Sequence, residues 1–182
     1  MKIPKPPAPR LIVGVIPLCL LTFAILTDAR QSSPFNLKDR YVKSEHRIPM
    51  RDGVKLYTVV YSPKDASQKY PILMMRTPYS VAPYGVDLYR PSLGPSELFA
   101  REGFIFVYQD VRGRWMSEGE YVNMRPHQAV KAGPKDVDES TDTWDTIDWL
   151  VKNVPESNGR VGILGISYNG FLPLMALVNP HP

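Results

Sequence analysis

Cysteine is almost absent from this sequence. Its 182 residues include one cysteine, Cys19, which lies in an N-terminal stretch that we expect to be removed. A mature form without cysteine has no disulfide bond, no thiol nucleophile and no thiolate metal site. Dense runs of lysine and arginine are also missing. Loss of residues 1–29, with Lys2, Lys5, Arg10 and Asp28, lowers the formal net charge from +4 to +2. This low and scattered charge argues against nucleic acid as a partner.

Residues 1–29 have the pattern of a secretory signal peptide. Positive residues come first, an apolar run follows over 11–26, and residues 27–29 resemble a cleavage site. The apolar run is short for a membrane span and is interrupted by Gly14 and Pro17. We therefore expect export to the periplasm or the medium, without a stable membrane span. A retained N-terminal anchor is the alternative.

Residues 30–40 are expected to be a polar linker or arm, and residues 41–182 one globular portion. Two extended runs, 41–49 and 54–61, flank Asp52-Gly53, which is a hairpin signal because glycine tolerates a positive φ. Buried strands and helices then alternate. The strands are expected at 71–75, 104–108 and 161–164, and the helices at 95–103, 136–153 and 168–178. This order predicts an α/β fold with an antiparallel hairpin followed by parallel βαβ units.

A candidate nucleophile follows the last predicted strand. The segment Gly165-Ile-Ser167-Tyr-Asn-Gly170 joins this strand to an apolar helix, as the G-x-S-x-G nucleophile elbow of α/β-hydrolases does. A serine on such a turn projects its hydroxyl from the sheet edge. The helix N-terminus adds backbone N–H groups and a positive dipole end, which favour the negative charge of acyl transfer.

Partners for this serine are not evident in the sequence. An α/β-hydrolase supplies its triad in the order Ser, Asp or Glu, His, yet the fifteen residues after Ser167 contain no carboxylate. His181 would lie on the order of 20 Å from the hydroxyl beyond the helix. His46 and His127 are interpreted as surface residues. We expect the triad Asp and His beyond Pro182, and the chain to be the N-terminal part of a larger enzyme.

Five segments resemble the α-amino-acid ester hydrolases, which group with cocaine esterase, glutaryl-cephalosporin acylases and Xaa-Pro dipeptidyl peptidases. The segments are 49–57, 76–79, 109–113, 117–119 and 138–162. The resemblance covers about residues 38–182 and implies the N-terminal part of an α/β-hydrolase domain. By position, it makes Ser167 the nucleophile. The hydroxyl of Tyr79 and the backbone N–H of Tyr168 become the oxyanion donors.

The resemblance implies hydrolysis or transfer of small-molecule acyl esters and amides, such as α-amino-acid esters or β-lactam-type acyl groups. It implies no cofactor and no metal, and it is compatible with a homo-oligomer of the full-length enzyme. Asn169 departs from the pattern, where a glutamate is expected. The helical cap, the jelly-roll domain and the carboxylate cluster that binds an α-ammonium group are not within these residues. An Xaa-Pro dipeptidyl peptidase and a catalytically inactive truncated remnant remain alternatives.

Overall fold

A computed structural model describes residues 35–133 and 135–182, so the predicted signal peptide lies outside the described residues. All the elements belong to the unit Asn36–Pro182. They are, in chain order, α1 (Leu37–Arg40), β1 (Tyr41–Pro49), β2 (Lys55–Pro63), β3 (Tyr70–Thr77), α2 (Glu97–Arg101), β4 (Ile105–Asp110), α3 (Glu139–Asn153), β5 (Ser157–Ile163) and α4 (Tyr168–Val178). The one-turn helix α1 falls within the predicted linker, just before β1.

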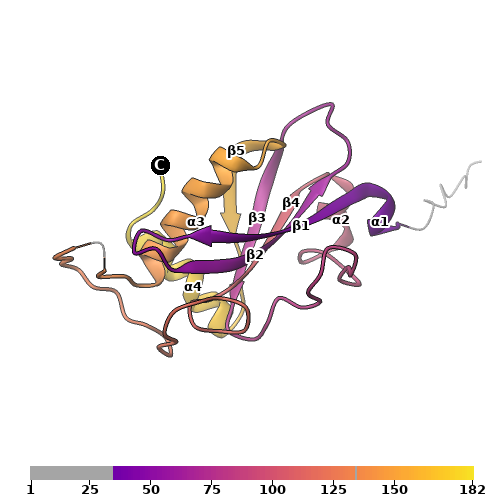
Figure 1. The fold of residues 1–182 in the computed structure, drawn as a ribbon. Coiled ribbons are helices and arrows are strands. Elements are labelled where there is room, and N and C mark those ends of the chain that lie inside the picture. Colours follow the sequence, from indigo (N-terminus) through magenta and orange to yellow (C-terminus); the bar gives the residue numbers. More distant parts are fainter. Residues whose placement is uncertain (1–34, 134) are drawn as a thin grey trace, which may run out of the picture. The chain divides into compact units, whose positions relative to one another are not determined.

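The strands form one mixed sheet in the order β1-β2-β4-β3-β5 (Figure 1). β1 and β2 are the predicted antiparallel hairpin, and β2 also pairs antiparallel with β4. β3 pairs parallel with both β4 and β5. The predicted α/β fold, a hairpin followed by parallel units, is therefore confirmed. Within the described residues β5 is an edge strand, as expected for a sheet without its later strands.

β5 begins earlier than predicted. The sequence favoured a strand at 161–164, because Pro155 and Gly159 suggested a loop before it. In the structure Ser157 already pairs with Tyr70, and the ladder shifts between Tyr70 and Ile72 before Val161 pairs with Ile72. Gly159 adopts a φ of 81° within this irregular stretch. Glycine tolerates that conformation without strain, so it lets the strand continue through a bulge instead of ending there.

The apolar core lies between the sheet and α3. Inward-facing side chains of all five strands pack with the second half of this helix. The fully buried members include Ile48, Leu56, Val60, Ile72, Met74, Ile105, Val107 and Leu150. Their removal from water supplies the main driving force for folding at about 25 cal/mol per Å² of apolar surface. The core places α3 across the sheet, and α4 packs beside it.

The first half of α3 meets the sheet through polar groups instead. Arg76 of β3 is fully buried; its Nη1 donates to Glu139 Oε2 at 2.9 Å and to Thr143 Oγ1 at 2.8 Å. Its Nε donates to Gln109 Oε1 at 2.7 Å, and Gln109 Nε2 donates to Thr146 Oγ1 at 2.9 Å. Buried charge is tolerated when it is paired and hydrogen-bonded. These contacts hold the N-terminus of α3 at the carboxyl ends of the parallel strands.

Arg112 joins the hairpin turn to the same helix. Its Nε and Nη2 donate to the two carboxylate oxygens of Asp142 at 3.0 and 2.7 Å. Its Nη1 donates to Asp52 Oδ2 at 2.7 Å. Two parallel hydrogen bonds from a planar guanidinium to a carboxylate fix the relative orientation of the two side chains. The predicted turn at Asp52-Gly53, the loop after β4 and the start of α3 are therefore fixed together.

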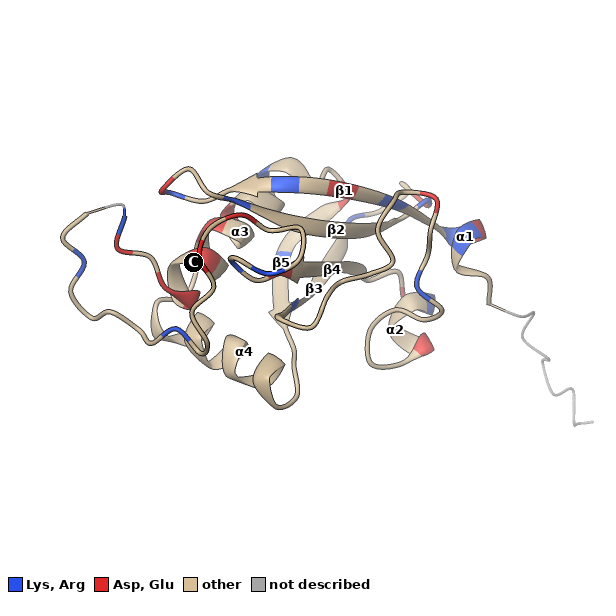
Figure 2. Cartoon of the chain, turned by 60° about the horizontal axis from the view of Figure 1, so that its bottom comes forward, with Lys and Arg blue, Asp and Glu red and all other residues tan. Residues whose placement is uncertain are grey.

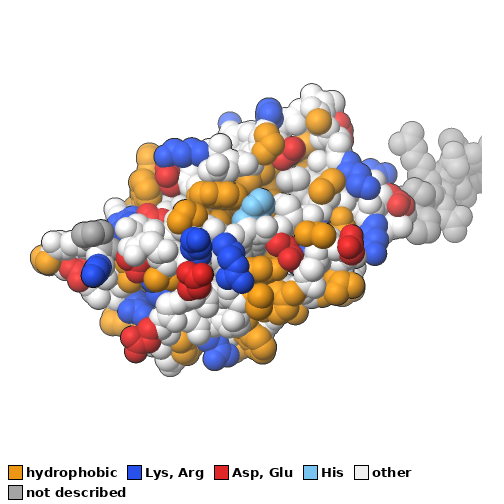
Figure 3. Space-filling view, viewed as in Figure 1, with side chains coloured by type: hydrophobic (Ala, Val, Ile, Leu, Met, Phe, Trp, Pro, Cys, Tyr) orange, Lys and Arg blue, Asp and Glu red, His pale blue; other side chains and the backbone are white. Residues whose placement is uncertain are grey.

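The exposed surface of α4 is apolar. α4 carries no charged residue (Figure 2), and Leu174 and Leu177 are 61% and 72% exposed. On the face shown in Figure 3, apolar side chains lie among charged ones. In the described part of the chain, no helix is both long enough and apolar enough to cross a membrane.

Candidate active site

The loops that carry the candidate residues meet at one edge of the sheet. β3, β4 and β5 run parallel, with Thr77 opposite Asp110 and Met74 opposite Ile163. Their carboxyl ends therefore lie together, which is where open α/β sheets place their ligands. Tyr79 follows β3, and Ser167 follows β5.

Ser167 has the backbone conformation predicted for an elbow. It lies between β5 and α4 with φ 59° and ψ −125°, a left-handed φ that serine rarely adopts. Its carbonyl oxygen accepts the first bonds of α4, from Gly170 N at 2.8 Å and Phe171 N at 3.1 Å. Ser167 is the N-cap residue, yet its side chain makes no capping hydrogen bond. The residue is exposed, and its hydroxyl is not used to hold the helix.

Close packing requires Gly165 of the elbow and leaves little room at Gly170, although the spacing of these glycines differs from G-x-S-x-G. Asn169 stands two residues after Ser167, and Gly170 stands three residues after it. A Cβ atom at Gly165 would lie 1.9 Å from the carbonyl oxygen of Asn169. A Cβ atom at Gly170 would lie 3.2 Å from the carbonyl oxygen of Gly165. The turn therefore brings backbone against backbone, and a side chain at Gly165 would open it.

Tyr79 lies beside the elbow. Its ring centroid is 6.1 Å from that of Tyr168, in an edge-to-face arrangement, and its side chain is 63% exposed. The preceding carbonyl, Pro78 O, accepts from Arg114 Nε at 3.0 Å and from Trp115 Nε1 at 2.9 Å. The loop after β4 thus holds the start of the loop after β3. Tyr79 and Tyr168, which lie far apart in the sequence, are neighbours in the structure.

Asp110 organises the Tyr79 loop, although it is not among the predicted site residues. This buried residue ends β4; its Oδ1 accepts from Val81 N at 3.0 Å and its Oδ2 from Tyr84 Oη at 3.0 Å. Burial raises the pKa of Asp110, and the bonds from Tyr84 and Val81 partly offset that rise. Ser80, between Tyr79 and Val81, has a φ of 89°. The signal for Asp110 was a carboxylate at the carboxyl end of an apolar strand.

Lys43 holds the far half of this loop. Its buried ammonium group donates to the carbonyl oxygens of Pro83 and Gly85 at 2.7 Å and of Leu88 at 2.9 Å. Glu45 balances the charge at 2.9 Å. A loop held by a buried carboxylate at one end and a buried ammonium at the other is ordered before any ligand binds. Such preorganisation is what an oxyanion donor needs.

The side chain of Tyr168 joins the elbow to the long loop after β4. Its Oη accepts a hydrogen bond from Met124 N at 2.6 Å and from Tyr121 Oη at 3.2 Å. Burial raises the pKa of Tyr168 to about 12, and the Tyr121 contact adds to the rise. The phenol therefore stays protonated at neutral pH. Its role in the described structure is to anchor residues 121–124 over the first turn of α4.

Comparison with known proteins identifies the family to which this arrangement belongs. A model of the X-Pro dipeptidyl-peptidase (S15) family matches residues 52–182. The chain belongs to the S15 family. Cocaine esterase from Rhodococcus sp. (strain MB1 Bresler) is 36% identical over 140 residues, which are 76% of this chain and 21% of that protein.

The solved structures similar to the S15 chain include two with more than 40% sequence identity. A selenomethionine-labelled α-amino acid ester hydrolase is 46% identical with a TM-score of 0.67, covering 87% of this chain and 27% of that chain. An aminopeptidase from the marine sediment archaeon Thaumarchaeota archaeon is 44% identical with a TM-score of 0.66, covering 79% and 24%. The S15 chain thus spans between 21% and 27% of these relatives. It has the α/β-hydrolase fold of part of their length, as the resemblance implied.

The histidines of the S15 chain have other partners. His46 packs on Trp149 with ring centroids 5.0 Å apart, and burial lowers the pKa of His46. His181 Nε2 lies 3.4 Å from Asp148 Oδ1 on α3. His127 Nδ1 lies 3.0 Å from Asp138 Oδ2. His46 and His127 are both partly exposed, and contacts with α3 and its N-cap cover the rest of each ring. Within the described residues, no histidine hydrogen-bonds to Ser167.

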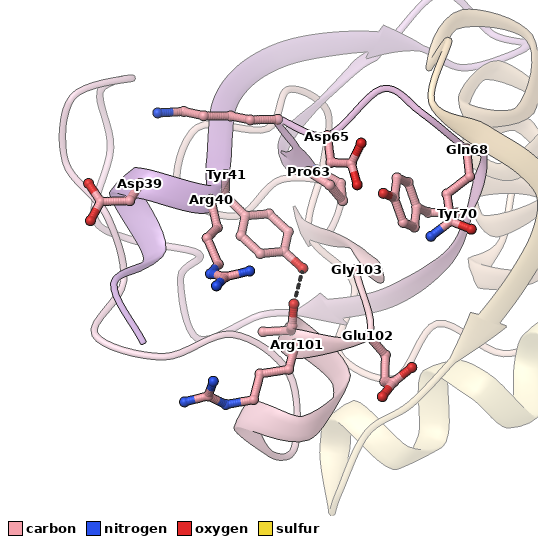
Figure 4. Close-up of a pocket in the computed structure, with 12 residues that line it drawn as sticks. Asp39, Arg40, Tyr41, Pro63, Asp65, Gln68, Tyr70, Arg101, Glu102 and Gly103 are labelled. Carbon is pink, nitrogen blue, oxygen red and sulfur yellow. Dashed lines mark hydrogen bonds between the residues drawn. The ribbon is translucent and has the colours of Figure 1, made fainter. Parts of the chain in front are cut away.

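A cavity lies at the opposite edge of the sheet from the elbow. It has a volume of about 470 Å³ and lies at the amino ends of β1 and β3 (Figure 4). Tyr41 and Tyr70 line it, and Tyr41 Oη donates to Ala100 O at 2.9 Å. None of the candidate residues lines this cavity. The candidate active site is therefore the exposed elbow, and the cavity is a separate feature.

Asp138 links the long loop to α3 and gives a prediction about stability. This buried N-cap residue accepts from Gln128 N and Lys131 Nζ at 2.9 Å through Oδ2, and from Thr141 N at 2.9 Å through Oδ1. Burial alone would raise the pKa of Asp138. The bonds from Gln128, Thr141 and Lys131 outweigh burial and lower it from 3.8 to about 2.

Because the pKa is lower in the folded state, ionised Asp138 stabilises the protein above pH 3.8, and this contribution is lost as the pH falls toward 2. We expect Asp138→Asn to lower the free energy of unfolding by on the order of 2 kcal/mol at neutral pH and by little near pH 2. Urea unfolding followed by circular dichroism across this range measures the difference. Asp87→Asn, at an exposed loop position, controls for the lost charge. An equal destabilisation at both pH values would contradict the prediction.

Proposed function

We propose that this protein is a serine hydrolase of acyl esters and amides, with Ser167 as its nucleophile. The observation that carries the proposal is the conformation of Ser167. It is an exposed serine with a φ of 59° at the start of α4, and its hydroxyl makes no capping bond. Backbone strain of this kind persists where the surrounding structure holds it, which is often at functional sites. Membership of a hydrolase family supports the same reading.

In the proposed reaction, Ser167 Oγ attacks the acyl carbonyl carbon and its proton passes to a general base. The carbonyl electron pair moves to oxygen, and the Tyr79 hydroxyl and the Tyr168 N–H donate to this oxyanion. Collapse of the intermediate expels the alcohol or amine, which takes the proton from the base. Water then attacks the acyl-enzyme and releases the acid. The described histidines have other partners. We therefore propose that the general base is a residue of the full-length protein that is not among the described residues.

We propose α-amino-acid esters and related acyl compounds as the substrate class. The 46% identity to an α-amino acid ester hydrolase and the 36% identity to a cocaine esterase support esters. Removal of Xaa-Pro dipeptides is the second candidate, because the family model carries that description and an archaeal aminopeptidase is 44% identical. These proteins match between 76% and 87% of this chain, so substrate assays must separate the two.

The test treats the full-length protein with a fluorophosphonate probe and maps the labelled peptide. Labelling at Ser167 is expected, and a labelled site elsewhere would overturn the nucleophile assignment. A panel of 4-nitrophenyl acetate, an α-amino-acid methyl ester and an Ala-Pro-4-nitroanilide then separates the two activities. Faster turnover of the esters supports an ester hydrolase, and preference for the anilide supports a dipeptidyl peptidase. A folded protein that neither labels nor turns over any substrate would be the inactive remnant.

A further inference from the structure

Arg114 is an arginine beside the candidate active site, and among the described residues no carboxylate forms an ion pair with it. It is half-buried, and its Nε donates to Pro78 O at 3.0 Å. Its guanidinium carbon lies 5.8 Å from the Trp115 ring centroid and 5.0 Å from that of Tyr121. The only hydrogen bond of this guanidinium in the described residues is the Nε bond, so both η nitrogens are open. A guanidinium with an open fork is suited to bidentate binding of a carboxylate.

The other buried arginines of this face are already paired. Arg76 contacts Glu139, and Arg112 contacts both Asp52 and Asp142. Asp110 is the carboxylate that faces Arg114, and the Arg114 charge lowers the pKa of Asp110. The Asp110 oxygens are occupied by backbone and phenol donors, and no ion pair joins the two residues among the described contacts. Arg114 therefore retains its capacity for an external anion.

Contacts place Arg114 next to the reacting groups on two sides. Through Pro78 it adjoins Tyr79, the proposed oxyanion donor. Through Tyr121, whose Oη donates to Tyr168 Oη at 3.2 Å, it adjoins the residue after Ser167. A carboxylate bound by its η nitrogens would therefore lie beside residues that adjoin Tyr79 and contact Tyr168.

Trp115 lies beside Arg114 and adds an apolar side chain to this part of the surface. It has a φ of 50° and is 58% exposed, and its Nε1 donates to Pro78 O at 2.9 Å. A positive φ is unfavourable for a bulky residue, so the surrounding structure must hold Trp115 in this conformation. The conformation places the indole ring at the surface, next to Met116, which is 41% exposed. The fixed ring offers an apolar wall next to the open guanidinium.

We propose that Arg114 and Trp115 form a subsite that binds a carboxylate group carried by the substrate. The proposal rests on the proposed function, because the ligand is a substrate of the Ser167 reaction. Arg114 binds the carboxylate through its η nitrogens, and Trp115 packs against the carbon chain beside it. The carboxylate is part of either the acyl group or the leaving group, and matched substrates distinguish these two positions.

The test measures kcat/KM of the full-length protein for pairs that differ in one carboxylate. Mono-4-nitrophenyl glutarate and 4-nitrophenyl pentanoate place it in the acyl group, and 4-acetoxybenzoate and 4-acetoxybenzamide place it in the leaving group. The ratio compared is kcat/KM of the charged substrate divided by kcat/KM of its neutral partner. In the pair whose carboxylate occupies the subsite, Arg114→Gln should lower this ratio by roughly 10- to 100-fold, mainly through KM. Arg114→Lys should restore part of it, because lysine retains the charge without the fork. Arg160→Gln, an exposed position on β5, controls for the lost charge and should leave the ratio unchanged.

An unchanged ratio for both pairs in Arg114→Gln would overturn the subsite, even if both rates fell, since equal loss indicates only a displaced Tyr79 loop. A second readout does not require turnover. Titration with glutarate should shift the Trp115 indole N–H signal in NMR spectra of the wild-type protein, and neither glutaramide nor the Arg114→Gln variant should reproduce the shift. A shift in a protein without hydrolase activity would retain the subsite and reject the proposed function. No shift together with an unchanged ratio rejects the subsite alone.

Discussion

Ser167→Ala is expected to lower ester hydrolysis by the full-length protein by about 10⁴- to 10⁶-fold in kcat. The hydroxyl is the group that forms the acyl-enzyme, and alanine cannot replace it. Residual activity would come from binding and the oxyanion donors alone. The left-handed φ of 59° is strained for alanine as it is for serine, so the elbow backbone should persist.

The measurement is initial-rate hydrolysis of an activated ester, with fluorophosphonate labelling as a second readout. Ser157→Ala is the matched control, because Ser157 lies at the opposite end of β5 and its hydroxyl accepts only a local bond from Gly159 N. That variant should keep wild-type turnover. A Ser167→Ala protein within tenfold of wild type would rule out the nucleophile role.

Tyr79→Phe is expected to lower kcat by roughly 10²- to 10³-fold, the range observed when one oxyanion donor is removed. The phenyl ring preserves the edge-to-face contact with Tyr168, for which the ring centroids are 6.1 Å apart. Only the O–H group is lost, and its bond forms as charge develops on the oxyanion. KM should therefore change much less than kcat.

Steady-state kinetics of the same ester give both constants for this variant. Tyr70→Phe is a suitable control, since Tyr70 begins β3 at the opposite edge of the sheet and lines the separate cavity. Its kcat should match wild type. If Tyr79→Phe raised KM with an unchanged kcat, Tyr79 would be a substrate-binding residue instead of an oxyanion donor.

Much of the fold could be predicted because its signals are local. The turn at Asp52-Gly53 and the apolar runs before and after Ser167 are contiguous in the sequence. Helices expected at 136–153 and 168–178 correspond to α3 (Glu139–Asn153) and α4 (Tyr168–Val178). The start of β5 was less predictable, because a glycine with positive φ carries the strand through an irregularity that sequence pattern interprets as a loop.

The sequence by itself determined the elbow, since the conformation of Ser167 depends on a strand, a helix and the glycines immediately around it. Only the tertiary structure decided which side chains surround this serine. Asp110 and Val81, Lys43 and Pro83, and Tyr79 and Tyr168 are each pairs from distant segments. Strand order and register bring them together, and no local pattern encodes a buried charge that is satisfied by a remote loop. For the same reason the sequence did not indicate the two unbonded η nitrogens of Arg114. Whether a guanidinium has a partner among the described residues depends on how distant segments fold together.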